Sequence, residues 1–216
     1  MKQGTRSDPD ATGVQEAKSA LAREKICRAV TGCLVELGYA DTSINRVAAQ
    51  AGVSKGALQH HYPSKEDLMA ATAAHLLGNA TFLHMRNTRG DTAARSTARE
   101  LRRIWRRGAN TDEFQALLEI LVRMRTDTRL RERLSPALRA WHEQSAEMTR
   151  QGYAATSGRE EDVDLLMAMN ACLIRGLVIQ QQYTDDRQFI ARILERWIEL
   201  VSPLISPRDE PGDPAG

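Results

Sequence analysis

Residues 38–68 read GYADTSINRVAAQAGVSKGALQHHYPSKEDL, a segment dense in helix caps, small residues and turn residues. Its first half predicts a short helix that either Thr42 or Ser43 can cap. Gly52 ends this helix, because glycine accepts the positive φ of a tight turn. Small and apolar residues recur at helical spacing and predict one inward face, formed by Ile44, Val47, Ala48 and Ala51.

The second half of the segment predicts another short helix, from Lys55 to about His61. Ser54 is positioned to cap it, and the capping-box spacing of Ser64 and Asp67 begins the next helix. Two short helices joined by a three- or four-residue turn with glycine are typical of a helix-turn-helix, whose second helix enters the DNA major groove. Leu58 would point inward and leave polar side chains outside. A helical hairpin with a solvated face is the alternative.

The similarity to a helix-turn-helix protein extends beyond the spacing of caps and turns to the residues themselves. Segments ICRA, LVELGY, TSI, VAAQAGVSKGAL and HYPSKEDL follow one another between Ile26 and Leu68. Together they resemble the DNA-binding domain of the tetracycline-repressor (TetR) family, over about residues 20 to 70. This resemblance implies a three-helix N-terminal domain that reads a palindromic operator, C-terminal helices that form a homodimer, and a pocket for a small-molecule effector that releases the DNA.

The resemblance also implies which residues meet DNA. Gln59 departs from the aromatic residue that many relatives have there, and it can pair with adenine. Lys55 can reach guanine, and each such pairing contributes about 1–3 kcal/mol of discrimination. Lys65 beside a helix N-terminus suits a phosphate. For each residue the alternative is an ordinary solvated side chain. The expected DNA-binding set is Ser43, Asn45, Ser54, Lys55, Gly56, Ala57, Gln59, His60, His61, Tyr62 and Lys65.

Helical spacing continues along the chain, and no segment has the alternation of a strand, so the expected fold is all-α. Ser135 and Pro136 have the chemistry of a helix start, and Gly158 that of its end. Further helices are expected at about 66–84, 92–108, 112–126, 136–156, 160–182 and 187–202. The expected division is a disordered arm (1–15), a helix-turn-helix domain (16–66), an effector-binding and dimerisation domain (67–206) and a disordered tail (207–216).

Two C-terminal helices carry wide apolar stripes that need a partner. Two helices from each subunit could form a four-helix bundle between subunits, and the family resemblance favours this dimer over a stripe that closes a monomer core. The expected interface residues are Leu166, Asn170, Leu173, Leu177, Ile190, Ile193, Leu194, Trp197 and Ile198.

The middle helices offer large or adaptable side chains for an apolar effector, although such residues also form ordinary core. Arg175 could anchor an acidic effector or make a salt bridge. The arginines at positions 95, 99, 102, 103, 106 and 107 could mark an anion site or an auxiliary DNA contact, or simply a solvated face. The expected pocket residues are Trp105, Phe114, Met124, Trp141, Met148, Met169, Cys172 and Arg175.

Composition narrows the function classes. The net charge of +2 is too small to indicate nucleic acid by itself, although residues 1–65 are basic and residues 185–216 acidic. Cys27, Cys33 and Cys172 lack metal-ligand spacing and are expected to be buried in a protein of the reducing cytoplasm. The opening residues lack the apolar core of a signal peptide, so export is not expected. Arg175 interrupts the one long apolar stretch, so a membrane span is not expected either.

Catalytic motifs are missing from the sequence. The five histidines form no HExxH pair, and there is no Walker loop or GxSxG elbow, so neither an enzyme nor a bound cofactor or metal is expected. The expected function is a dimeric, sequence-specific transcriptional regulator, a repressor that a small molecule releases from its operator. An activator and a constitutive architectural DNA-binding protein are the alternatives.

Overall fold

The computed structural model describes the backbone of residues 9–88 and 96–208, and the side chains of residues 19–79 and 96–208. Helices make up most of this part of the chain, which confirms the all-α expectation. They are α1 (Pro9–Asp41), α2 (Ile44–Ala51), α3 (Lys55–His61), α4 (Lys65–Thr88), α5 (Thr97–Ile104), the π-helical η2 (Trp105–Ala109), α6 (Asp112–Arg123), α7 (Thr128–Gly152), α8 (Glu160–Gln180), α9 (Arg187–Val201) and the 3-10 turn η3 (Ser202–Leu204).

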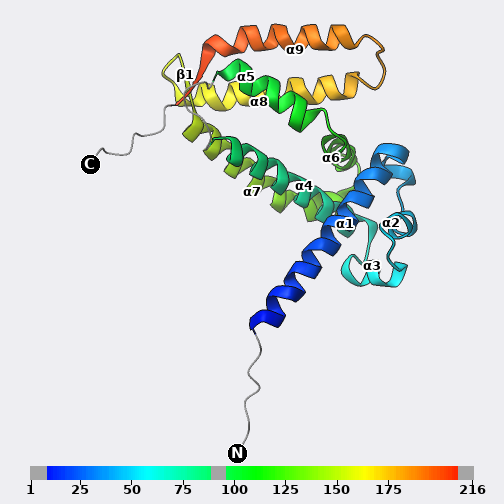
Figure 1. Cartoon of the computed structure of the whole chain (residues 1–216). Helices are drawn as coiled ribbons and strands as arrows, with labels where there is room; N and C mark the ends of the chain where they lie inside the picture. The colour runs from blue at the N-terminus through cyan, green and yellow to red at the C-terminus, as the bar shows by residue number, and fades with distance from the viewer. Residues whose placement is uncertain (1–8, 89–95, 209–216) are drawn as a thin grey trace, which may run out of the picture.

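Helices α1 to α3 form an N-terminal head, and the elements from α4 onward form a body (Figure 1). The head closes around fully buried side chains from each of its helices, namely Val30, Leu34, Val47 and Leu58. Its core continues without a break into the body through Leu68 and Met69 of α4 and Ile120 of α6. The head is therefore packed onto the body rather than tethered by a linker.

The body has two layers (Figure 1). Helices α4 and α7 pack along each other, and α6 packs against both α1 and α4. The second layer contains α5, α8 and α9, which share a smaller core around Leu101, Leu177 and Leu194. Burial of these aliphatic side chains, about 1.5–3 kcal/mol each, is what holds the short α5 against the two long helices.

A two-stranded antiparallel ribbon, which the sequence did not predict, closes the body. Strands β1 (Tyr153–Ala155) and β2 (Ile205–Pro207) pair with Ala154 opposite Ser206. The hydroxyl of Thr97 donates to the carbonyl of Ile205 (2.8 Å), which ties the ribbon to α5. Three residues are too few for an alternating pattern to be visible. Gly158, expected to end a helix, instead takes its positive φ (76°) in the turn after β1.

The predicted start of α7 was wrong. The helix begins at Thr128, where the Asp127 side chain caps it by accepting from the Leu130 amide (3.0 Å). Pro136 lies inside the helix, and the hydroxyl of Ser135 donates to the Arg131 carbonyl (2.6 Å). Full burial of two leucines in this first part, Leu130 and Leu134, compensates for the backbone hydrogen bond that a proline cannot donate.

Two other expectations also need correction. Residues 9–15, expected in a disordered arm, begin α1, while residues 1–8 lie outside the described part. Pro207 ends β2, and the amide of Arg208 donates to the Gly152 carbonyl (2.8 Å). The expected disordered tail, which began at residue 207, therefore starts too early. Residues 209–216 lie outside the described residues. Cys27 and Cys33 are buried as expected, whereas Cys172 is exposed, because none of the described elements covers its side of α8.

None of the helices described combines the length and the apolar character that crossing a membrane requires.

Candidate nucleic-acid interface

Serine side chains begin both short helices of the head. The hydroxyl of Ser43 accepts from the Arg46 amide (3.3 Å) at the start of α2, and that of Ser54 accepts from the Ala57 amide (3.1 Å) at the start of α3. Thr42 is buried and donates its hydroxyl to the Gly38 carbonyl (2.7 Å). Of the two possible caps for α2, Ser43 is thus the one used, and Thr42 instead secures the end of α1.

The turn between α2 and α3 has the geometry that the glycine predicted. Gly52 lies in the left-handed region (φ 61°, ψ 39°), and its amide donates to the carbonyls of Ala48 and Ala49. The Val53 amide donates to the Ala48 carbonyl (3.0 Å), which completes the end of α2. Residues 52–54 therefore turn the chain sharply into α3, as in a helix-turn-helix.

Helix α3 presents one buried residue and a broad exposed surface. Of its seven residues, all described, Leu58 alone is buried, at 1% exposure. Side chains of the rest are exposed to solvent, as are Asn45 on α2 and the cap Ser54. The imidazole rings of His60 and His61 lie edge to face, 5.4 Å apart. The exposed residues of α3 are Lys55, Gly56, Ala57, Gln59, His60 and His61.

Gly56 is informative because the fold does not require it. A methyl group added at this position would meet no protein atom within 4 Å, and its backbone is an ordinary helical one. Glycine costs a helix interior about 1 kcal/mol relative to alanine. The bare backbone at this point of α3 thus provides open space on the outer surface, where a large partner could approach closely.

Tyr62 and Lys65 are less free than the residues of α3. Tyr62 is half-buried; burial raises the pKa of its phenol, and the nearby Arg23 guanidinium lowers it in part. The Lys65 amine donates to the carbonyls of Tyr39 (2.6 Å) and Ala40 (3.2 Å) at the end of α1. Desolvation lowers the pKa of this amine. Lys65 therefore holds the end of α1, a use that competes with the expected phosphate contact.

Lys65 belongs to a joint between head and body. The centre of this joint is Tyr39, a residue to which the sequence analysis assigned no role. Gly38 interrupts α1 with a positive φ (73°), and the freed Tyr39 amide donates to the Glu119 carboxylate of α6 (3.3 Å). The amine of Lys65 lies 4.4 Å from the centre of the Tyr39 ring. The only sequence signal for this joint was Tyr39 itself, within the LGY segment.

We expect Lys65→Ala to lower the free energy of unfolding by about 1–3 kcal/mol, because two carbonyls of α1 lose a charged donor. Urea unfolding of the full chain measures this effect. Lys55→Ala, at an exposed position without such contacts, is the control and should leave stability unchanged. A Lys65→Ala variant as stable as the parent, with weaker binding to every DNA, would assign the amine to phosphate instead.

Comparisons with known proteins agree with this geometry. The family model of bacterial regulatory proteins of the tetR family matches residues 27–72. An uncharacterized HTH-type transcriptional regulator of Mycobacterium tuberculosis is 28% identical over 182 residues, covering 82% of this chain and 92% of the relative. The HTH-type transcriptional repressor AcnR of Corynebacterium diphtheriae is 23% identical over 185 residues, covering 84% and 92%. Residues 27–72 of this chain therefore form a TetR-type DNA-binding segment, and the relatives of the whole chain are HTH-type transcriptional regulators.

A solved structure shares the two-part helical fold of this chain. A transcriptional regulator from Saccharomonospora viridis, solved in complex with choline, superposes with a TM-score of 0.62 at 20% identity, covering 88% of this chain and 100% of that one. Family and relatives alike are transcriptional regulators, so the chain is a regulator with a DNA-binding helix-turn-helix and not an enzyme.

The residues expected to line an effector pocket are dispersed in the body. Trp105 and Phe114 pack with Ile174 and Val178, whereas Met124 and Trp141 pack on the core shared by head and body. A hollow of about 550 Å³ beside Tyr39 contains none of the expected residues. Of the remaining four expected residues, Met148 and Arg175 are half-buried, and Met169 and Cys172 are exposed.

The residues of the expected dimer stripe pack largely within the chain itself. Leu177, Ile190, Leu194 and Ile198 are buried in the core with α5, and Leu166, Leu173 and Ile193 pack against it. The Trp197 indole donates to the Asn170 amide oxygen (3.0 Å) within the same layer. Within one chain α5 thus covers the buried members of this stripe, whereas Leu166, Leu173, Ile193 and Trp197 remain partly exposed.

A different apolar surface remains uncovered on α8 and α9. On α8, Leu165, Met169, Cys172 and Ile179 are exposed at steps of 4, 7 and 14 residues from Leu165, which places them along one face. On α9, Phe189 and Leu200 are also exposed, and Leu204 follows the helix. We call these seven residues the outer stripe. Periodicity alone did not distinguish it from the stripe that α5 covers.

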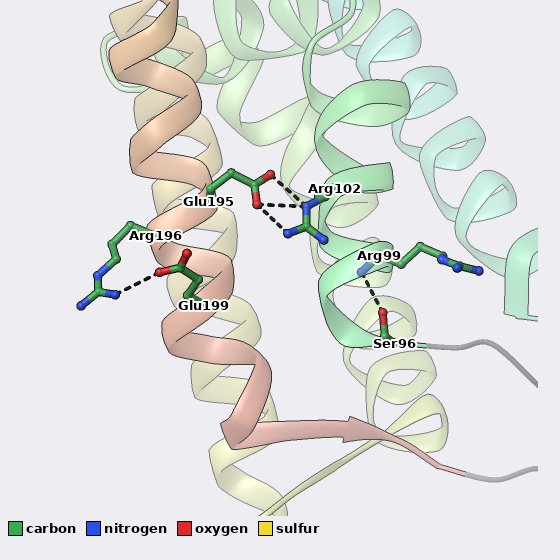
Figure 2. Close-up of polar contacts among 6 residues, drawn as sticks. All are labelled: Ser96, Arg99, Arg102, Glu195, Arg196 and Glu199. Carbon is green, nitrogen blue, oxygen red and sulfur yellow. Dashed lines mark hydrogen bonds and ion pairs between the residues drawn. The ribbon is translucent and has the colours of Figure 1, made fainter.

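The arginines of α5 are partly paired. Figure 2 shows Arg102 facing Glu195 of α9, with contacts of 2.6 to 3.0 Å, and this pairing lowers the pKa of the Glu195 carboxyl. Arg103 pairs with Glu100 on its own helix. Arg106 and Arg107 are exposed, and Arg95 lies outside the described residues. Part of the arginine run thus joins α5 to α9 instead of forming an open anion site.

Proposed function

We propose that this TetR-family regulator is a homodimeric repressor of the cytoplasm that binds a palindromic operator and leaves it when a small effector binds. The observation that carries the DNA-binding part is the exposed surface of α3, anchored from below by Leu58 and positioned by the turn at Gly52. The proposed division follows the expected one, with a DNA-binding domain over residues 16–66 and an effector and dimerisation domain over residues 67–206.

In this proposal α3 lies in the major groove. Lys55 and Gln59 are one helical turn apart and exposed, so both can face base edges. The open space at Gly56 and the small Ala57 let the backbone approach the DNA closely. Ser43, Asn45 and Ser54 at the helix starts, with His60, His61 and Tyr62 at the end of α3, would contact bases or phosphates around this centre.

We expect Gln59→Ala to reduce the preference for operator over random DNA by about tenfold or more, because the pairing of its amide with a base is removed. Binding to random DNA should change little, since that binding depends on phosphate contacts. Fluorescence anisotropy with both DNAs measures the ratio. Gln188→Ala, exposed on α9, serves as the matched control. Equal losses on the two DNAs would refute a reading role for Gln59.

The outer stripe supports the dimer part of the proposal. Exposed apolar side chains that share a face of a helix, as those of α8 do, are typical of a protein interface, and α9 adds further exposed apolar side chains. A second copy related by a two-fold axis would place its own α8 and α9 against those of the first copy, giving an isologous four-helix bundle. The two α3 helices would then lie on the same side, able to meet half-sites about 34–36 Å apart.

Effector release is supported by the shared fold and by the joint. The S. viridis regulator was solved in complex with choline, so a protein of this fold binds a small molecule. In this chain the cluster of Trp105 and Phe114 with Ile174 connects η2, α6 and α8, and α6 also holds Tyr39 through Glu119. An effector that moves α6 would thus change the angle of the head and the spacing of the α3 helices.

A screen for release tests this part. Operator complexes are titrated with small cations, carboxylates and aromatic compounds, and the repressor proposal expects at least one class to lower DNA affinity. Transcription from the bound promoter should rise when the gene is deleted. A fall in transcription would indicate an activator, and affinity insensitive to every compound would favour a constitutive architectural role.

A further inference from the structure

No other element covers the first part of α1 within the part of the chain that the structure describes. Residues 19–25 are exposed on every side of the helix, and Leu21 is 66% exposed. Figure 1 shows this part of α1 projecting beyond α2 and α3. An isolated helix of this length is marginal in water, so a surface that covers part of it would stabilise it.

Two cations lie on the projecting part, on the side that continues the packed face of α1. Arg23 is one turn before Cys27, and Lys25 is one turn before Ala29; both Cys27 and Ala29 are buried in the head core. The side chains of Arg23 and Lys25 therefore extend the same face past the edge of the head. Neither makes an ion pair with any residue that the structure describes.

Both cations border the helix-turn-helix. The Lys25 amine would lie 3.5 Å from a methyl group added at Gly52, so it is next to the turn that leads into α3. Arg23 is close enough to Tyr62, directly after α3, to lower the pKa of its phenol against the effect of burial. One cation thus lies near the start of α3 and the other near its end.

We propose that Arg23 and Lys25 bind phosphates of the operator beside the groove that α3 enters, so that α1 is a second DNA-contacting element. This inference rests on the DNA-binding function proposed above. Double-stranded DNA is the partner whose charge fits two unpaired cations continuous with the exposed face of α3. The neighbouring Arg28 is already paired with Glu24 (2.9 Å) and does not take part in this binding.

The test uses the full chain with a duplex of random sequence, because phosphate binding needs no operator. Arg23→Gln and Lys25→Gln should each weaken binding about three- to tenfold at low salt. In each variant the slope of log affinity against log salt should fall by about 1, because one phosphate is no longer neutralised by the protein. Arg23→Lys should restore most of the affinity. Arg139→Gln, an equal reduction of charge at an exposed position of α7, is the control and should have little effect.

The outcomes separate this inference from the function on which it rests. If the parent chain binds no DNA, the proposed function fails. If the parent binds and both glutamine variants retain its affinity and salt slope, α1 binds no phosphate and the inference is wrong. Both sites are exposed, so the melting temperatures of the variants should be unchanged. A decrease in affinity equal to that of Arg139→Gln would show only an effect of net charge and would overturn the inference.

Discussion

Replacing Met169 and Leu200 together with aspartate should leave the chain folded, convert it from dimer to monomer, and weaken operator binding on the order of a hundredfold or more. Both side chains belong to the outer stripe and are 57% and 53% exposed, so the monomer tolerates a charge at either site. In the proposed dimer both would be buried, and each copy would bring two unpaired carboxylates into an apolar interface, which is strongly unfavourable.

Weaker binding follows from separation of the two heads. A dimer holds its second α3 near the second half-site, and this linkage raises affinity by about 10²–10⁴ over one head alone. Sedimentation and anisotropy on the same samples measure mass and binding. Gln144→Asp, which adds a charge at an exposed site of α7, is the control. A variant that stays dimeric, or a parent that is already monomeric, would contradict the role of the outer stripe.

Leu58→Ala should destabilise the chain by about 2–5 kcal/mol, the range for truncating a buried leucine. Leu58 is 1% exposed and is the side chain through which α3 is held on the head core. Its truncation leaves α3 anchored mainly by its ends, so operator binding should fall even at temperatures where the body remains folded. Urea unfolding and anisotropy together measure both effects.

Leu58→Met provides the matched variant, because it keeps nearly the same volume and should cost less than about 1.5 kcal/mol. Recovery of DNA binding in this variant would attribute the weaker binding of Leu58→Ala to packing. If Leu58→Ala unfolds within about 0.5 kcal/mol of the parent, a range typical of surface substitutions, then α3 is not held through the core as described.

Sequence reasoning succeeded where local chemistry determines structure. The helix-turn-helix is specified by Ser43, Gly52 and Ser54, each of which acts on backbone groups within three or four residues. The reciprocal bonds of Ser64 and Asp67 at the start of α4 are equally local. Such contacts can be anticipated because their partners are fixed by the spacing along the chain.

Sequence reasoning failed where distant segments decide. Pro136 is an ordinary helix start in sequence, yet burial of Leu130 and Leu134 extends α7 before it. The stripe of Ile190 and Leu194 matches a dimer interface until α5 is seen to cover it. For Lys65 no sequence pattern indicated the hydrogen bond to the Tyr39 carbonyl, which competes with the expected phosphate contact. In each case the competing partner lies in another element, and no local pattern identifies it.

The most direct test of the central claim is anisotropy of the full chain with DNA from immediately upstream of its own gene, beside random DNA of equal length, across several salt concentrations. A sequence-specific regulator should bind one DNA saturably and at least about 10³-fold more tightly than the other. Where the upstream DNA is no better, fragments selected from the whole genome replace it in the same assay. Equal affinities with equal salt slopes for every selected fragment would contradict the account, because α3 would then be reading no sequence.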